Sequence, residues 1–81
     1  MTNNIYAPTL CVGDHVLITW NEGQYGKSKQ YLVVGNKWSN FSLADMLTGE
    51  MITPPQDTLS DLQEIIQRDI DNGRITYIQS F

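Results

Sequence analysis

Residue types that carry acid–base or nucleophilic chemistry are few in this chain of 81 residues. It has one histidine, His15, and one cysteine, Cys11. A general acid or base works inside a cleft with a partner group, and the sequence around His15 indicates neither. No serine or cysteine lies in a nucleophile elbow. We therefore predict that the protein is not an enzyme and that His15 is a structural or surface residue.

The sequence also lacks the usual metal and cofactor motifs. One cysteine with one histidine gives no zinc-ligand set, and Cys11 has no second cysteine for a disulfide within the chain. No basic residue close to Cys11 in sequence activates its thiol, so we expect a small buried hydrophobic residue there. Gly23 and Gly26 lie in a polar loop that no helix follows, which argues against a phosphate-binding loop. We predict no cofactor and no metal.

Acidic residues follow one side of the predicted helix near the C-terminal end of the sequence. This acidic stripe consists of Asp57, Asp61, Glu64 and Asp71, with Arg68 between them. The carboxylates of the stripe, together with Asp69, could dock on a basic protein surface, including one that normally binds DNA or RNA. A solvated helix face is the other interpretation of the same pattern. We take Asp57, Asp61, Glu64 and Asp71 as candidate partner-binding residues.

Aromatic and basic residues gather in the first two predicted hairpins. The set is Trp20, Tyr25, Tyr31 and Trp38, with Lys27, Lys29 and Lys37. The rings could stack on bases, peptide prolines or a nucleotide while the lysines contact phosphate. Rings in strands usually belong to the core instead, whereas Tyr25 lies in a loop between glycines. The alternative ligand-binding residues are therefore Tyr25, Lys27, Lys29 and Trp38.

The formal net charge of −4 is distributed unevenly. Residues 1–40 carry three lysines and two acidic residues, for a net charge of +1, whereas residues 41–81 carry two arginines and seven acidic residues, for −5. An acidic chain disfavours non-specific binding to phosphate backbones, so direct nucleic-acid binding is not expected. A partner protein with a basic surface is more consistent with this net negative charge.

The elements that must position these residues are strands followed by one helix. Alternating apolar residues predict strands over 14–20, 30–35, 38–46, 51–53 and 74–81. In the first strand Val16, Ile18 and Trp20 share one face, and in the last strand Ile75, Tyr77 and Phe81 alternate against Thr76 and Ile78. Gly49 is expected at positive φ in the turn of the 38–53 hairpin. A buried stripe of Leu59, Leu62, Ile65, Ile66 and Ile70 predicts the helix. Thr58 is the preferred N-cap, although Ser60 could also form a capping arrangement, and Asn72-Gly73 ends the helix.

The order β-β-β-β-α-β predicts a mainly β (α+β) domain spanning residues 1–81, with residues 1–9 as an N-terminal arm. We expect a small five-stranded antiparallel SH3-like barrel with the helix before its last strand. A flatter α+β sheet packed on the helix is the alternative. Ile5, Tyr6 and Leu10 could dock the arm on the core. A domain this small has a thin stability margin, so a homo-oligomer is a further expectation.

Four segments carry a resemblance. They are Gly13-Asp14-His15-Val16-Leu17, Tyr31-Leu32-Val33-Val34, the stretch from Phe41 to Glu50, and Thr58-Leu59-Ser60-Asp61-Leu62. Together they resemble small uncharacterised proteins of phages and prophages of Gram-positive bacteria, over roughly residues 13–78. The resemblance implies a small accessory protein that binds a host or phage macromolecule, and it assigns no site residue.

Two functional hypotheses follow. The first is a non-enzymatic interaction module, a phage or prophage protein that binds and modulates a bacterial protein, such as a nucleic-acid-acting or defence enzyme that it inhibits. The second is a binder of a small ligand, nucleotide or nucleic acid that uses the first hairpins. Residues 1–5 show no signal-peptide pattern and no apolar run reaches ~18 residues, so we expect the cytoplasm of the host cell and no membrane.

Overall fold

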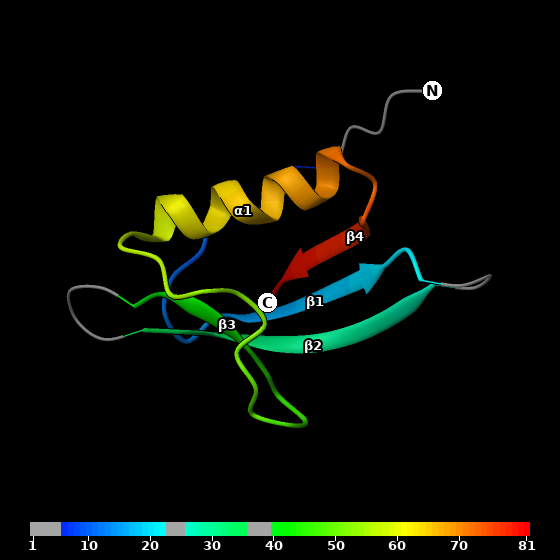
Figure 1. Ribbon diagram of the computed structural model, residues 1–81. Helices are drawn as coiled ribbons and strands as arrows, with labels where there is room; N and C mark the ends of the chain where they lie inside the picture. The colour runs from blue at the N-terminus through cyan, green and yellow to red at the C-terminus, as the bar shows by residue number, and fades with distance from the viewer. Residues whose placement is uncertain (1–5, 23–25, 36–39) are drawn as a thin grey trace.

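The computed structural model describes residues 6–22, 26–35 and 40–81. It consists of one antiparallel sheet of four strands and one helix (Figure 1). The elements are β1 (His15–Trp20), β2 (Lys27–Val34), β3 (Ser42–Asp45), α1 (Leu59–Asp71) and β4 (Ile75–Ser80). The order of strands across the sheet is β3-β2-β1-β4. The expectation of a mainly β domain with a helix before the last strand is confirmed.

The described residues form neither a fifth strand nor a closed barrel. The segment 51–53, expected as a strand, makes only an isolated bridge between Met51 and Ala44, and a second bridge joins Gln56 to Phe41. β3 has only four residues to pair with, and the following prolines lack the N–H groups that a ladder needs. β3 and β4 end the sheet on opposite sides, as in the flatter α+β alternative.

The first hairpin is longer than the sequence indicated. β2 begins at Lys27 and not at residue 30, because its ladder with β1 continues as far as the Trp20–Lys27 pair. Lys27 and Lys29 therefore belong to a strand. Because they are two residues apart, their side chains lie on the same face of the sheet. The loop between the strands is correspondingly shorter than predicted.

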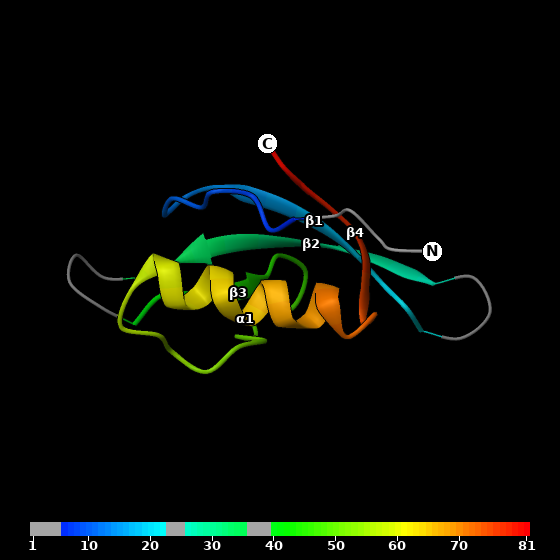
Figure 2. The same cartoon turned by 90° about the horizontal axis from the view of Figure 1, so that it is seen from above.

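The core lies between the sheet and α1, which runs along one face of the sheet (Figure 2). Alternate residues of the two central strands, Val16 and Ile18 in β1 and Tyr31 and Val33 in β2, are buried on this face. The helix contributes Leu62, Ile66 and Ile70, and the remaining buried apolar residues are Leu10, Leu43 and Ile75. Each buried aliphatic side chain contributes roughly 1.5–3 kcal/mol to folding, which makes this layer the main source of stability.

The ends of α1 agree with the sequence. The hydroxyl of Thr58 accepts a hydrogen bond of 3.0 Å from the backbone N–H of Asp61, so Thr58 is the N-cap. At the other end Asn72 is the C-cap and Gly73 has φ +77°. A glycine adopts this left-handed conformation without the penalty that a Cβ would add, which is why the helix ends here.

In β4 the predicted faces are wrong. The sequence pattern placed Ile75, Tyr77 and Phe81 on one face, but the pairing with β1 shifts between Thr19 and Trp20. Trp20 pairs with Ile75 and Thr19 with Tyr77, so β4 has one extra residue in this bulge. Beyond it, Ile78 and not Tyr77 packs against the core.

The described part of the N-terminal arm is attached to the helix by side chains. Gln67 Oε1 accepts a hydrogen bond from the Ala7 N–H at 2.8 Å, and Gln63 Oε1 accepts one from the Leu10 N–H at 3.1 Å. Leu10 is buried in the core as expected, whereas Tyr6 is 74% exposed. Ile5 lies outside the described residues.

Candidate functional site: a cleft beside the acidic helix

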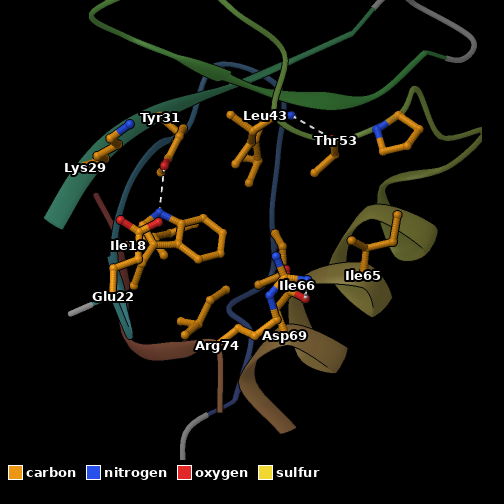
Figure 3. A pocket seen from close by; sticks show the side chains of 14 residues that line it. Ile18, Glu22, Lys29, Tyr31, Leu43, Thr53, Ile65, Ile66, Asp69 and Arg74 are labelled. Carbon is orange, nitrogen blue, oxygen red and sulfur yellow. Dashed lines mark hydrogen bonds and ion pairs between the residues drawn. The ribbon is translucent and has the colours of Figure 1, made fainter. Parts of the chain in front are cut away.

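A cleft of about 400 Å³ opens between α1, the covered face of the sheet and the segment 52–54 (Figure 3). Its walls come from parts of the chain that are distant in sequence, from Ile18 in β1 to Ile75 in β4. Apolar side chains line its depth: Ile18, Leu43, Ile66 and Ile75. Its volume is within the range of small-ligand sites, and it is also large enough for an apolar side chain of a partner.

Trp20 and Tyr31 form the aromatic part of the cleft. The Trp20 indole N–H donates a hydrogen bond of 2.7 Å to the Tyr31 hydroxyl (Figure 3). The rings meet edge to face, with centroids 6.2 Å apart and planes at 88°. Burial raises the pKa of Tyr31, the hydrogen bond from Trp20 lowers it, and the negative charges of Asp45 and Glu22 raise it further. Tyr31 is thus held neutral, with its hydroxyl fixed by the indole.

Charged side chains of both signs stand among the lining residues. Arg74 Nη1 lies 3.6 Å from Asp69 Oδ1, which pairs the end of the helix with the residue before β4. Lys29 Nζ lies 3.7 Å from Asp45 Oδ2. Asp45 lies outside the lining, and Glu22 is the fourth charged residue of the lining. The two cations and two carboxylates leave the cleft without formal net charge.

Asp45 anchors the turn that follows β3 and also holds Lys29. Its carboxylate accepts hydrogen bonds from the N–H groups of Leu47 at 2.8 Å and Thr48 at 3.2 Å. The bond from Leu47 is the main reason why the pKa of Asp45 is lowered; partial burial opposes it, and Thr48 and Lys29 lower the pKa further. Gly49 completes this turn at φ +77°, as the sequence predicted.

The acidic stripe lies on the solvent side of the helix. Asp57 and Asp61 are exposed at its N-terminal end, and Glu64 and Asp71 are exposed farther along. Arg68 Nη2 lies 3.7 Å from Glu64 Oε1, with both side chains more than 60% exposed, and Asp71 Oδ1 accepts a hydrogen bond from Gln67. An exposed i,i+4 pair contributes only a few tenths of a kcal/mol, so these carboxylates are accessible to a partner.

Ile65 connects the cleft and the acidic stripe. Its side chain is half-buried and lines the cleft. Asp61 and Arg68 lie four residues before and three residues after it, and residues at this spacing are neighbours on a helix surface. A molecule that entered the cleft over Ile65 would therefore approach the stripe as well.

The four alternative ligand-binding residues are not brought together by what the structure describes. Lys29 lines the cleft with Trp20 and Tyr31, whereas Lys27 is exposed near the start of β2. Tyr25 and Trp38 lie outside the described residues. Sequence reasoning missed Glu22 and Arg74, since no local pattern marks residues that meet only after the helix has packed on the sheet. Asp69, expected among the carboxylates that dock on a partner, instead lines the cleft beside Arg74.

His15 and Cys11 lie away from the cleft lining. His15 Nε2 is 2.7 Å from Gln30 Oε1, and its ring lies 5.5 Å from that of Phe81. Cys11 is exposed, so the expectation of a buried residue is wrong. The reason is the turn that follows it, in which the Cys11 N–H donates to Asp14 Oδ2 and the chain reverses at Gly13, φ +95°.

Comparisons with protein-family models, curated proteins and solved structures found no match. Within residues 6–22, 26–35 and 40–81, no three His, Cys, Asp or Glu side chains are grouped as a metal site would require. The one helix of this part of the chain is too short and too polar to cross a membrane.

Proposed function

We propose that this protein is a non-enzymatic protein-interaction module, a phage or prophage accessory protein that binds and modulates a bacterial host protein in the cytoplasm. The resemblance of its sequence segments supports the class. The surface of α1 supports the mode of binding, because an open apolar cleft and an exposed row of carboxylates adjoin at Ile65. That adjacency is the observation on which the proposal rests.

The proposed mode combines one apolar anchor with surrounding basic residues. An apolar side chain of the partner enters the cleft between Trp20 and Ile65, which is worth roughly 1.5–3 kcal/mol when the side chain is fully buried. Lysines or arginines beside this anchor face Asp61 and Glu64 on the stripe. Attraction between exposed charges speeds association and is weakened by salt, so binding should decrease as ionic strength rises.

Charge reversal on the stripe tests the proposal. Tagged wild-type protein is incubated with bacterial lysate at low salt, and the host protein that it retains is identified by native mass spectrometry and then purified. Glu64→Lys and the double variant Asp61→Lys/Glu64→Lys should weaken its affinity, the double variant by about tenfold or more. Glu50→Lys, an exposed reversal in the turn after β3, is the matched control and should change it far less.

Circular dichroism of each variant verifies the fold. Equal losses for Glu50→Lys and Glu64→Lys would show that only total charge matters, and an unchanged affinity of the double variant would exclude the stripe. Ile65→Ala tests the anchor separately, because it shortens a half-buried side chain at the edge of the cleft and leaves every charge in place.

A small ligand in the same cleft is the second candidate, favoured by the position of Lys29 beside Trp20 and Tyr31. Such a ligand would have an apolar or aromatic body and an anionic group near Lys29. The direct test is the fluorescence of Trp20 in a Trp38→Phe background, titrated with mononucleotides at low salt. A saturable change that Lys29→Ala abolishes would support this candidate, and a flat response would remove nucleotides as ligands.

A further inference from the structure

We propose that the free edge of β4 pairs with the β4 edge of a second copy of this chain, which joins two sheets into one of eight strands. Three features of β4 favour this pairing: its hydrogen-bonding pattern, its side chains and a register that is complementary to itself. The cleft and the acidic stripe of the proposed function take no part in the pairing.

The hydrogen-bonding groups along β4 alternate in direction. The Phe81 N–H donates to the His15 carbonyl of β1 at 2.8 Å, and the ladder continues with Gln79 opposite Leu17 and Tyr77 opposite Thr19. In an antiparallel ladder the intervening residues turn their N–H and C=O groups to the other side. Ile78 and Ser80 therefore direct theirs away from β1, and no hydrogen bond from another described residue reaches them.

The opposite edge of the sheet is covered. Along β3 the Ile52 N–H donates to Leu43, the Asp45 N–H donates to Glu50, and Phe41 and Gln56 exchange two hydrogen bonds. Natural proteins protect exposed edges with charges, prolines, bulges or covering segments. From Tyr77 to Phe81, β4 has no charged residue and no proline, and its bulge lies before this stretch. It is the unprotected edge of the described sheet.

The face of the sheet opposite α1, here called the outer face, supports the same conclusion. The strand residues that alternation places on it are His15, Leu17, Thr19, Ser28, Gln30, Leu32, Val34, Ser42, Ala44, Tyr77 and Gln79, followed by Phe81. Among these described positions there is no Asp, Glu, Lys or Arg. Charged residues are depleted and aromatic residues enriched at the centres of protein interfaces. Tyr77 is 45% and Phe81 66% exposed in the single chain.

One register of β4 against its copy uses all of these features. If Gln79 faces Gln79 of the second copy, Ile78 and Ser80 exchange hydrogen bonds with Ser80 and Ile78 of that copy. The same register places Tyr77 opposite Phe81 twice, once on each side of the two-fold axis. Aromatic cross-strand pairs add to the stability of sheets. The two-fold axis runs perpendicular to the sheet, so both helices lie on the same side and two acidic stripes are displayed together.

Sedimentation or light scattering of the purified chain gives the first test. The wild type should have twice the monomer mass of 9.2 kDa. Gln79→Lys places two like charges opposite each other at the two-fold axis and should give folded monomer. Ser28→Lys adds the same charge on the outer face of β2 and should remain dimeric. A monomeric wild type overturns the proposal, and so does monomer formation by both variants, which would indicate packing through the outer face.

Cross-linking tests the register. In a Cys11→Ser background, Gln79→Cys should form a disulfide between copies under mild oxidation, because residues directly opposite in an antiparallel pair have Cα atoms about 4.5–5.5 Å apart and disulfides span that distance. Gln30→Cys in the same background is the control and should not cross-link. Equal cross-linking of the two variants would refute pairing through β4, as would capture of an unrelated strand by wild-type β4 in place of a second copy.

Discussion

Replacement of Thr58 by alanine should loosen the first turn of α1. The Thr58 hydroxyl accepts the N–H of Asp61 at 3.0 Å, and this N–H has no partner within the helix. Loss of such an N-cap costs typically ~1 kcal/mol, within a range of about 0.5–2. For a domain of this size, 1 kcal/mol lowers the melting temperature by roughly 4–8 °C. Asp61 lies in the loosened turn, so the binding of a partner to this end of the acidic stripe should also weaken.

Thermal unfolding followed by circular dichroism measures this effect. Ser60→Ala is the matched control, because Ser60 is an exposed hydroxyl residue inside the same first turn and alanine is a better helix former there. It should leave the melting temperature unchanged or slightly higher. Thr58→Asp restores a capping acceptor and should recover most of the loss. If Thr58→Ala and Ser60→Ala melt at the same temperature, the capping argument fails.

Three further predictions concern the turn after β3 and the cleft. The pKa of Asp45 is lowered in the folded state, so its contribution to stability is present above the unfolded pKa near 3.8 and lost as the pH falls through the folded value. Urea unfolding should show that Asp45→Asn has a lower free energy of unfolding than the wild type at pH 7, and this difference should disappear at low pH. An equal difference at both pH values would contradict this prediction. The pKa of Tyr31 is raised, so the stability contributed by its neutral form is lost as the pH rises above 10. Ultraviolet titration should show a tyrosinate component that forms at higher pH than that of an ordinary tyrosine and that Tyr31→Phe removes. Persistence of this component in the variant would assign it to another tyrosine. Gly49→Ala should lower the free energy of unfolding in urea by about 1–2 kcal/mol, because φ is +77° at this position. The cost comes from the backbone conformation alone, since an added Cβ would meet no atom within 4 Å. An unchanged unfolding midpoint would show that the turn relaxes.

The helix could be predicted from the sequence because its signals are local. The apolar spacing, Thr58 as the N-cap and Gly73 after the last turn each act within one or two turns of chain, and all three are confirmed. The alternation that buries Val16 and Ile18 is also local and is confirmed.

Features that depend on long-range pairing could not be predicted. The barrel and its extra strand required the segment 51–53 to form a full ladder, and it forms only the isolated bridge between Met51 and Ala44. The bulge at Thr19 and Trp20 reverses the faces of Tyr77 and Ile78, and because both residues are apolar the sequence does not show which of them faces the core. The cleft joins Trp20, Tyr31 and Asp69 from three elements, so it is defined only after the helix has packed.

The position of β1 between β2 and β4 has a consequence for folding kinetics. Its ladder with β2 closes a short loop, whereas β4 starts at Ile75, 55 residues beyond the end of β1 at Trp20. Closing the longer loop costs more chain entropy and slows the formation of its contacts. We expect the β1–β2 hairpin to form early and β4 to join the sheet late. Until β4 arrives, the second edge of β1 is open, so the folding chain is most prone to aggregation in that interval.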